Sequence, residues 1–380
     1  MIRWAILTGE YPPTPGGVSD YTRLLATALA DTGDEVHVWA PGKPEAADDA
    51  RVTVHRVPDH FGLHSLPRLD ADLSRLGCPR VRILVQYVPH AYGWKAMNLP
   101  FCLWLSGRWR KRFEVMFHEV SYSVCSGQPW KHNLLGHVTR RMARMIHNAA
   151  ARCWVAIPAW GDLLRRLAPG RSVPLEWLPV PSNVSVVHDP ARVAAVRMRY
   201  TTAGGPLVGH FGTFGKPTAE MLKGVLPRLL CRRTELSALL IGRGSVAFAA
   251  ELTRDYPNLA ERVRATGGLE PTALSTHLQA CDVFLQLYPD GASTRRGSLM
   301  AALAHGKPVV TNRGRHTESV PLQYGVRLVE NEIEAQVRAV EALLEDVVAR
   351  DQLAAAAIAL YESRFDVRHT VAILRSSSER

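Results

Sequence analysis

Two adjacent arginines, Arg295 and Arg296, lie directly before Gly297 and Ser298, which open a predicted helix that runs to His305. Guanidinium groups bind phosphate oxygens, and a helix N-terminus adds free N–H groups and the positive end of a dipole. This combination predicts a site for a diphosphate. Two solvated arginines on an exposed turn would give the same pattern.

Two further polar loops follow apolar segments in the same half of the chain. GHFGTFGK follows PLV, and GRGS follows ALLI. Because the carboxyl ends of parallel strands meet at one edge of a sheet, we expect these loops to lie beside the arginine pair. The candidate ligand residues that they bring are His210, Gly212, Thr213, Lys216 and Arg243.

A glycine pair, Gly16 and Gly17, follows the first apolar segment of the chain. It precedes a predicted helix, Ser19–Asp31, that Ser19 or Asp20 could cap. Glycines let backbone N–H groups approach an anion, so the pair is a candidate phosphate contact, although an ordinary strand-to-helix turn fits equally. The GxGxxG pattern is absent here, which counts against a nicotinamide or flavin site.

His118 ends the apolar segment EVMFH and is followed by Glu119. A histidine at the carboxyl end of a central strand points into the crevice where such sheets bind ligands. We therefore predict that His118 hydrogen-bonds a substrate hydroxyl or phosphate. The alternative is a histidine that is satisfied within the protein.

Short apolar segments alternate with helical patterns along the chain, and they form two series. The first series comprises residues 3–7, 35–39, 52–57, 81–87, 114–120 and 153–158; the second comprises 206–212, 238–242, 263–267, 283–288 and 308–311. Apolar strands without strict alternation, joined by helices, are typical of parallel sheets that are buried on both faces. The fold class is therefore α/β, with two doubly wound domains.

The domain boundary is expected within Pro179–Pro206, a stretch that contains PVPSNV, a DP step and AGG. We predict an N-terminal domain over residues 1–185 and a C-terminal domain over residues 186–360. The segment after Asn331 is almost wholly helical in pattern. Its last helix, about 361–380, has an apolar stripe that we expect to pack on the first domain; the stripe comprises Tyr361, Phe365, Val371 and Leu374.

The composition suits a protein with two buried cores, since 47% of the 380 residues are apolar. The longest membrane-like stretch, residues 99–105, is too short to span a bilayer, and the chain enters a strand without a signal-peptide pattern. We therefore expect a cytoplasmic protein. The six cysteines lack CxxC spacing and indicate reduced, largely core cysteines rather than a zinc site; they are Cys78, Cys102, Cys125, Cys153, Cys231 and Cys281.

The net charge of +11 is concentrated in one stretch, Ala91–Arg171, which holds 13 basic and three acidic residues. Such a patch indicates an anionic partner: a membrane surface, a nucleic acid or a phosphorylated substrate. Within it, Trp104 and Trp109 alternate with basic residues in residues 104–112. That pattern fits an interfacial helix on anionic lipid, or a core helix with a solvated basic tail. No nucleic-acid motif accompanies the charge, so no nucleic-acid partner is expected.

The segments GEYPPTPGGVSDYT, DVFLQLYPDG and AALAHGKPVVT resemble the retaining GT-B glycosyltransferases, the family that includes glycogen synthases, sucrose synthases and phosphatidylinositol mannosyltransferases. The resemblance covers essentially the full chain. It implies a GT-B fold, with two Rossmann-like domains facing a central cleft. It also implies a nucleoside-diphosphate-sugar donor held mainly by residues 186–360, an acceptor held mainly by residues 1–185, and retention of configuration with no obligatory cofactor or metal.

The resemblance also implies roles for individual residues. Gly16 and Gly17 match the loop that meets the donor diphosphate, and His118 matches a histidine near the transferred sugar. Ser293 and Ala301 occupy the two positions of the family's Glu-x7-Glu motif, and neither is a carboxylate.

The cationic residues of the family pattern change as well. His210 takes the place of an arginine, and Lys216 lies one residue late for a lysine. Arg295 and Arg296 are the expected replacements for the missing cations. Asp290 and Glu318 are the nearby carboxylates that could replace the missing glutamates.

The predicted function is transfer of a sugar from a nucleoside-diphosphate-sugar to a sugar, lipid-linked or phosphorylated hydroxyl acceptor, in polysaccharide or glycolipid assembly. From the basic stretch we also predict that the protein associates peripherally with the inner face of the membrane. Two alternatives remain. The missing glutamates would suit a non-catalytic sugar-nucleotide-binding or partner protein of the same fold. A nucleotide-sugar epimerase would need an acid–base pair, which His118 and Asp290 could supply.

Overall fold

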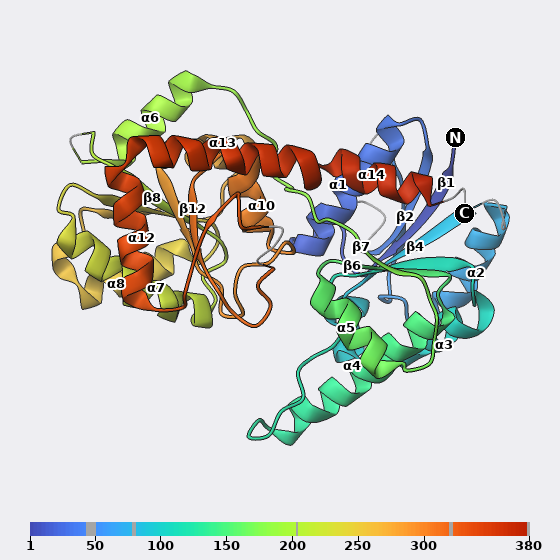
Figure 1. The fold of residues 1–380 in the computed structure, drawn as a ribbon. Helices are drawn as coiled ribbons and strands as arrows, with labels where there is room; N and C mark the ends of the chain where they lie inside the picture. Colours follow the sequence, from blue (N-terminus) through green and yellow to red (C-terminus); the bar gives the residue numbers. More distant parts are fainter. Residues whose placement is uncertain (43–50, 78–80, 203, 319–321, 378–380) are drawn as a thin grey trace. The chain divides into compact units, whose positions relative to one another are not determined.

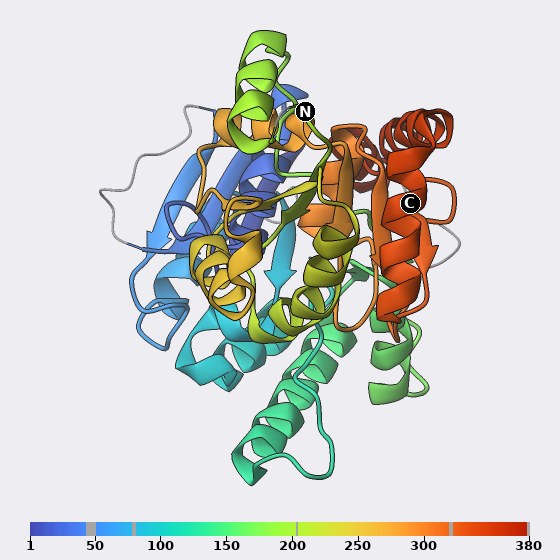
Figure 2. The ribbon, with the colours of Figure 1, turned by 90° about the vertical axis from the view of Figure 1, so that its left-hand side faces the viewer.

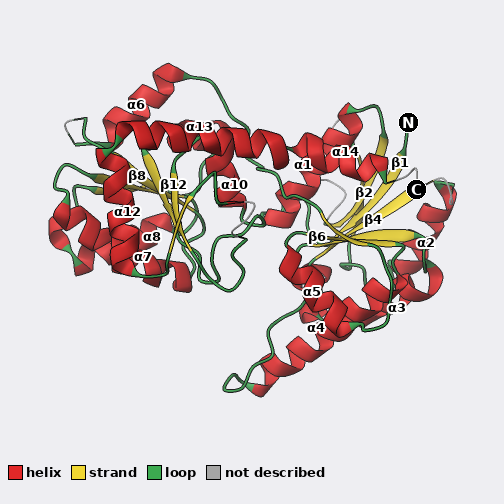
Figure 3. Ribbon diagram, viewed as in Figure 1, coloured by secondary structure: helices red, strands yellow, loops and turns green. Residues whose placement is uncertain are grey.

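The computed structural model describes residues 1–42, 51–77, 81–202, 204–318 and 322–377. The chain divides into two compact units. Unit 1 comprises Met1–Val180 together with Val367–Arg380, and unit 2 comprises Pro181–Asp366. Each unit is a parallel sheet with helices on its two faces, so the predicted α/β class with two doubly wound domains is confirmed (Figures 1 and 3).

Unit 1 contains a seven-stranded parallel sheet in the order β3-β2-β1-β4-β5-β6-β7. Its strands are β1 (Arg3–Thr8), β2 (Glu35–Pro41), β3 (Thr53–Val57), β4 (Val81–Tyr87), β5 (Phe113–Phe117), β6 (Arg152–Val155) and β7 (Leu175–Trp177). Its helices are α1 (Gly17–Asp31), α2 (Leu66–Arg75), α3 (Leu99–Arg108), α4 (Trp130–Ala149), α5 (Pro158–Leu167) and α14 (Val367–Ser376), with short 3-10 turns η1 (Pro89–Tyr92) and η2 (Trp94–Ala96).

Both faces of this sheet are buried, which explains the unbroken apolar runs of its central strands. Ala5 and Leu7 of β1 pack in the core beneath α2, α3 and α4. Trp4 and Ile6 face the opposite core, where α1 and α14 lie. Successive side chains of a strand point to opposite faces, so each face requires its own helical layer.

Helix α14 returns from the end of the chain to unit 1 and packs against α1. Val371 and Leu374 of the predicted apolar stripe are buried in this core. Thr370 Oγ1 donates a hydrogen bond to the Pro179 carbonyl at 3.0 Å. Arg82 of β4 fixes the last turn by donating to the Leu374 carbonyl and to Ser377 Oγ.

Unit 2 contains a six-stranded parallel sheet in the order β10-β9-β8-β11-β12-β13. Its strands are β8 (Leu207–Phe211), β9 (Ser237–Ile241), β10 (Val263–Ala265), β11 (Val283–Gln286), β12 (Val309–Asn312) and β13 (Arg327–Val329). Its helices are α6 (Pro190–Tyr200), α7 (Lys216–Arg232), α8 (Ser245–Asp255), α9 (Pro271–Ala280), α10 (Gly297–Ala304), α12 (Ile333–Glu345) and α13 (Val347–Arg364), with the 3-10 turn η3 (Pro257–Leu259).

The strand order of both sheets places β1 and β8 at the centre, where the direction of winding reverses. In such sheets, ligands bind outside the carboxyl ends of the strands at this reversal. The relevant neighbours are β1, β4 and β5 in unit 1, and β8, β11 and β12 in unit 2.

Several predicted details of the elements are corrected. β7 and β13, two edge strands of three residues each, were not predicted from the sequence. Helix α1 begins at Gly17 with Gly16 at the N-cap, and no side chain caps it, so the prediction of a Ser19 or Asp20 cap was wrong. Ser19 Oγ instead donates to the Thr14 carbonyl at 2.6 Å.

In the described part of the chain, no helix combines the length and apolar character that crossing a membrane would require. Of the cysteines described there, Cys102, Cys153 and Cys281 are buried, while Cys125 and Cys231 are exposed, and all five are free thiols. Cys78 lies outside the described residues.

Candidate functional site

The loops that follow the central strands of unit 2 meet at the carboxyl edge of its sheet. The amide of Gly212, just after β8, donates to the carbonyl of Ile241, the last residue of β9, at 3.0 Å. The Gln286 side chain, at the end of β11, donates to the Phe211 carbonyl at 3.2 Å. The candidate residues after β8, β9 and β11 therefore belong to one edge.

Asp290 organises the arginine pair at this edge. Its Oδ2 accepts from Arg295 Nη2 at 2.6 Å, and its Oδ1 accepts from Arg296 Nη2. The ring of His316, from the loop after β12, lies with Nδ1 3.1 Å from the same Oδ2. The Arg296 guanidinium also lies over the Tyr288 ring, 4.9 Å from its centroid. Both guanidiniums are thus held in place next to the N-terminus of α10.

The surrounding cations determine the charge state of Asp290. Burial raises the pKa of the Asp290 carboxyl, but the charges of Arg296 and Arg295 and the His316 bond outweigh it and lower that pKa to about 2. Asp290 is therefore ionised at neutral pH and forms ion pairs with both guanidinium groups.

A close backbone contact locks the loop after β11 to the loop after β12. Gly291 has φ of 87°, and a Cβ there would overlap the backbone of Gly314 and the hydroxyl of Thr317. The His316 amide donates to the Asp290 carbonyl at 2.8 Å, and the Ala292 amide donates to the Asn312 carbonyl at 3.0 Å. The arginine pair therefore lies on a loop that is fixed to its neighbouring loop by backbone contacts.

Both positions of the Glu-x7-Glu motif are fully buried. Ser293 is buried and Ala301 is buried in the second turn of α10. Glu318 reaches the neighbourhood of the first position, since its Oε2 accepts from the Thr294 amide at 2.6 Å and the Thr294 hydroxyl at 2.8 Å. Burial raises the pKa of the Glu318 carboxyl above its usual value, although the two hydrogen bonds from Thr294 lower it.

Polar side-chain atoms at this edge are buried without a hydrogen-bond partner among the described residues. They are His210 Nε2, Gln286 Oε1, Ser293 Oγ, Arg296 Nε, Thr311 Oγ1 and Glu318 Oε1. Buried polar atoms are rarely left unpaired in native proteins, so these atoms are available to water or to a ligand. Their grouping makes this edge a candidate site for a polar ligand.

His210 is uncharged at this edge. Burial lowers its pKa to about 4, although a bond from Nδ1 to the Leu285 carbonyl (2.8 Å) opposes the shift. Because Nδ1 donates to a carbonyl, Nε2 is a hydrogen-bond acceptor. His210 therefore replaces the arginine of the family pattern with a group that accepts a hydrogen bond and carries no positive charge.

The remaining candidate donor-binding residues lie at the same carboxyl edge of the unit 2 sheet. Lys216 is the first residue of α7 and is exposed, as are Thr213 and Arg243. Gly297 and Ser298 begin α10 as predicted, and Ser298 Oγ lies 2.9 Å from Tyr288 Oη.

Unit 1 has its own polar edge. Gly16 and Gly17 begin α1, and a Cβ on Gly17 would meet nothing within 4 Å, so its surface is open. A Cβ on Gly16 would overlap the carboxylate of Glu10. Glu10 Oε1 in turn lies 3.2 Å from His90 Nε2.

His118 lies one residue beyond the end of β5 and is buried. Its Nε2 lies 2.8 Å from Gln86 Oε1, and its ring packs edge-on against Tyr21 with centroids 4.7 Å apart. Burial lowers its pKa to about 3, so the imidazole is neutral. Because Nε2 donates to Gln86, Nδ1 is the acceptor that this tautomer offers to a ligand.

The interfacial-helix interpretation of residues 104–112 was wrong. Trp109 is only 1% exposed, and its Nε1 donates to Asp70 Oδ1 at 3.1 Å. Trp104 packs on the same core. The basic residues that follow α3 form a solvated tail, and Arg108 pairs with Asp70.

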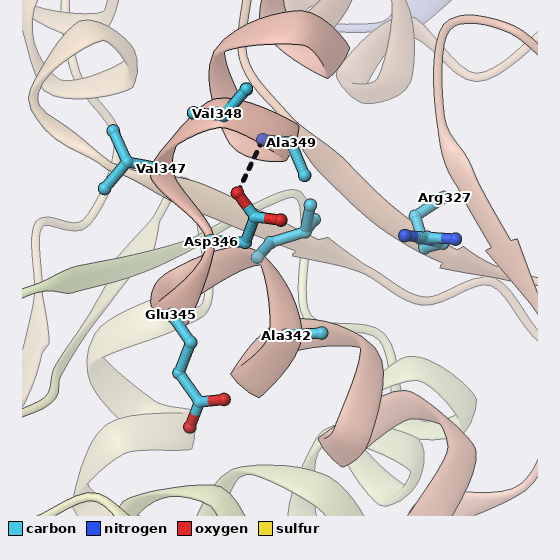
Figure 4. Close-up of a pocket in the computed structure, with 8 residues that line it drawn as sticks. Arg327, Ala342, Glu345, Asp346, Val347, Val348 and Ala349 are labelled. Carbon is cyan, nitrogen blue, oxygen red and sulfur yellow. Dashed lines mark hydrogen bonds between the residues drawn. The ribbon is translucent and has the colours of Figure 1, made fainter.

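Two pockets of unit 2 open at the opposite, amino edge of its sheet. The first, about 620 Å³, is lined by Arg327 at the start of β13 and by residues of the α12–α13 junction, where Asp346 accepts from the Ala349 amide at 2.9 Å (Figure 4). The second, about 250 Å³, is lined by residues that precede β11 and β12, including Asp282 and Lys307. Neither contains a candidate donor residue. Within the described ranges, no three His, Cys, Asp or Glu side chains are placed to hold a metal ion.

Several residues of these edges were not predicted. His316 is 26 positions from Asp290, and His90 is 80 positions from Glu10, so only the strand order brings each pair together. Gln286 and Thr311 are paired in the β11–β12 register and lie inside apolar runs, where nothing marks them as ligand groups.

Comparisons with known proteins agree with this architecture. Residues 16–179 match the family model described as "Glycosyl transferase 4-like domain", and residues 205–346 match "Glycosyl transferases group 1". No curated protein matches the sequence.

Solved structures show the same fold over the whole chain. The sucrose-phosphate synthase of Thermosynechococcus elongatus is 17% identical with a TM-score of 0.75, covering 99% of this chain and 98% of its own. HepE of Anabaena, in complex with UDP and glucose, is 18% identical with a TM-score of 0.70, covering 100% of both chains. WaaG, a glycosyltransferase involved in lipopolysaccharide biosynthesis, is 14% identical with a TM-score of 0.66, covering 97% of both chains.

Two doubly wound parallel sheets in tandem, each matching a glycosyltransferase model, define a GT-B glycosyltransferase. The two matched regions cover most of the sequence. The chain belongs to the glycosyltransferases described by these two models and is a nucleotide-sugar-dependent enzyme.

Proposed function

We propose that unit 2 holds the nucleoside-diphosphate-sugar at the carboxyl edge of its sheet, and that the sugar passes to a hydroxyl acceptor held by unit 1. The unpartnered buried polar atoms at the unit 2 edge carry this proposal, since a sugar nucleotide supplies hydroxyl donors and phosphate acceptors for them.

The arginine pair stabilises the departing diphosphate. Arg295 and Arg296 are oriented by Asp290 and lie beside the first turn of α10, whose amides add donors. Lys216, at the start of α7, adds a third cation. Donors already in place when charge develops lower the barrier without reorganisation. This arrangement supplies the charge that a metal would otherwise provide.

The buried acceptor atoms at the edge suit hydroxyl groups. His210 Nε2 and Glu318 Oε1 accept hydrogen bonds from the sugar or ribose, in place of the two missing glutamates. Gly212, Thr213, Arg243, Gly297 and Ser298 complete the donor site. The resemblance to retaining enzymes leads us to propose retention of configuration. In unit 1, Gly16 and Gly17 contact the diphosphate and His118 Nδ1 orients a hydroxyl.

Binding of the nucleotide is the direct test of this site. The solved complexes of HepE with UDP and UDP-glucose make UDP the first nucleotide to measure. At 100 times its dissociation constant, UDP should stabilise the protein by about 2.7 kcal/mol, read as a rise in melting temperature. GDP, ADP and TDP are measured in parallel.

Absence of a shift with all four nucleotides would contradict the donor site. Release of free sugar from the donor in the same preparation distinguishes an enzyme from a protein that only binds nucleotides. NMR of the anomeric proton in the first-formed product reports retention or inversion.

We also propose that unit 1 docks on the anionic inner face of a membrane through the exposed face of α4, in support of polysaccharide or glycolipid assembly. The N-terminal half of this helix projects from unit 1 (Figures 1 and 2). Trp130 is 70% exposed and Leu134 is 49% exposed, and residues four apart share one helix face. Exposed basic side chains accompany them: Lys131, His132, Arg141 and Arg144. An apolar anchor ringed by cations suits an anionic headgroup layer.

Sedimentation with vesicles tests this surface. The protein should bind phosphatidylglycerol vesicles at low salt and not phosphatidylcholine vesicles, because each basic residue near an anionic surface contributes about 1 kcal/mol. The R141E/R144E variant should lose most of this binding. The R165E/R166E variant, which changes the same number of cations on α5, is the control. Equal loss in both variants, or no binding to anionic vesicles at low salt, would refute the proposal.

A further inference from the structure

We infer that Gln86 is a positioning residue for the reaction: it holds the His118 imidazole in the tautomer whose Nδ1 accepts a hydrogen bond from the reacting hydroxyl. The inference rests on the proposed function, because it takes His118 as the residue that orients that hydroxyl. It gives a role to a buried amide that nothing in the sequence marks as functional.

Gln86 is a polar side chain in an apolar environment. It lies next to the last residue of β4 and is fully buried. In the register of the sheet its neighbours are Thr8 of β1 and Met116 of β5. Leu84, two positions earlier on the same face of the strand, and Met116 belong to the apolar core beneath α1 and α14. A hydrocarbon side chain would fill this position without burying polar atoms, so packing alone does not explain the amide.

The hydrogen bond to His118 is the interaction that accounts for the Gln86 side chain. Gln86 Oε1 lies 2.8 Å from His118 Nε2. The other end of the amide, Gln86 Nε2, is buried without a partner among the described residues. Unpaired N–H groups in a protein interior destabilise the fold. The effect of Gln86 on His118 therefore explains this residue better than a contribution to stability does.

This hydrogen bond determines which ring nitrogen of His118 carries the proton. An amide oxygen can only accept, so His118 Nε2 donates and Nδ1 keeps its lone pair. Burial lowers the pKa of His118 to about 3, and among the described residues no charged side chain contributes to that shift. The imidazole is therefore neutral at physiological pH, and its acceptor atom is Nδ1.

Other elements fix the place of the ring but not its proton. The His118 amide donates to the Tyr87 carbonyl at 3.0 Å, and Trp160 Nε1 of α5 donates to the His118 carbonyl at 2.9 Å. Tyr21 of α1 packs edge-on against the imidazole, with centroids 4.7 Å apart. Burial raises the pKa of the Tyr21 hydroxyl above its usual value, so this neighbour is uncharged. The hydrogen bond with Gln86 is thus the contact that sets the tautomer.

Gln86→Leu removes the acceptor at similar volume. Either ring nitrogen of His118 can then carry the proton, so turnover should fall at least about tenfold at every pH, as expected when a reacting group is held in the wrong tautomer. The dissociation constant of the nucleotide should be unchanged, because Gln86 lies in unit 1 and contacts no proposed donor residue of unit 2.

Gln86→Glu keeps an acceptor for His118 Nε2, so turnover at pH 8 should remain close to that of wild type. An adjacent opposite charge moves a pKa by about 1–3, so the carboxylate should raise the pKa of His118 from about 3 into the range of about 4–6. A protonated imidazole accepts no hydrogen bond. Turnover of this variant should therefore fall, relative to wild type, as the pH is lowered from 7 to 5.

The measurements are steady-state donor hydrolysis from pH 5 to 8 and nucleotide calorimetry on the full-length protein. The substrate is UDP-glucose, or the glucose conjugate of GDP, ADP or TDP if that nucleotide stabilises the wild type instead. Gln336→Glu, at a buried glutamine of α12, is the control for burying a carboxylate and should show no added acid loss.

Wild-type turnover in Gln86→Leu would overturn the inference, as would a loss in Gln86→Glu that is the same at every pH or is matched by Gln336→Glu. If Gln86→Leu does not fold, Gln86→Glu decides: a pH profile parallel to that of wild type overturns the inference. A wild type that binds none of the four nucleotides would refute the proposed function, on which this inference depends.

Discussion

Replacing both Arg295 and Arg296 by glutamine is expected to abolish measurable stabilisation by UDP. Each charge-assisted bond to a phosphate contributes roughly 1.5–3 kcal/mol, so the loss of two weakens binding by at least about 100-fold. The dissociation constants of UDP for wild type and variant, measured by calorimetry, check the prediction.

The double variant leaves Asp290 buried without its two main partners, which destabilises the fold in itself. The triple variant R295Q/R296Q/D290N removes that carboxylate charge and should regain stability without regaining UDP binding. The matched control is R228Q/R232Q, two arginines of α7 that pair with Glu334 on the surface. A triple variant that binds UDP as tightly as wild type would show that the arginines serve only Asp290.

Replacing His118 by alanine is expected to lower turnover by about 100-fold while changing the dissociation constant of UDP by less than about threefold. Its proposed contact is with a reacting hydroxyl, and misplacing a reacting group costs rates of this order. Steady-state kinetics on UDP-glucose, together with UDP calorimetry, separates the two effects.

The pH dependence gives a second readout for His118. Because burial holds its pKa at about 3, the ring is uncharged from pH 5 to 8, and the variant should keep the shape of the wild-type pH profile in that range. His147→Ala, at another buried histidine on α4, is the control for loss of packing. Unchanged turnover in His118→Ala would make His118 a structural residue that supports Tyr21 and Gln86.

The strands that carry the site were predictable because their signal is local. Residues 81–87 and 206–212 are apolar runs, and burial on both faces of a parallel sheet requires such runs. An edge strand pairs with a neighbour on one side only, so its side chains can be partly exposed and its sequence need not be an apolar run. β7 and β13 contain the short sequences LEW and RLV with partly exposed side chains, which explains why both were missed.

The site residues were predictable only where chemistry and chain position coincide. Arg295, Arg296 and the start of α10 are contiguous, so the sequence contains the whole arrangement. The partners that orient them are not contiguous. Asp290 was interpreted as a possible replacement for a missing glutamate, because nothing in the spacing shows that it faces the arginines.

The tryptophans beside the basic stretch show the same limit. The arginines that flank Trp109 left two interpretations open, an interfacial helix and a core helix with a solvated basic tail. The Trp109 indole is buried by contacts with Asp70 and the α2 side of the core, 39 positions earlier. A partner that is so far away in the sequence cannot be inferred from local composition. Trp130 packs on no such core and is exposed.

The glycine contact between the loops after β11 and β12 has a consequence for how donor preference can change. Gly291 and Gly314 touch backbone to backbone, so an insertion or a larger residue in either loop separates both. A change in the length of the loops after β11 and β12 is therefore not a route to a new donor sugar. The turns after β8 and β9 touch in the same way, because a Cβ on Gly242 would overlap the Gly212 carbonyl and one on Gly244 would overlap the Thr213 carbonyl. Directed evolution of donor choice should therefore exchange exposed side chains, such as those of Thr213 and Arg243, and leave the glycine contacts of both loop pairs intact.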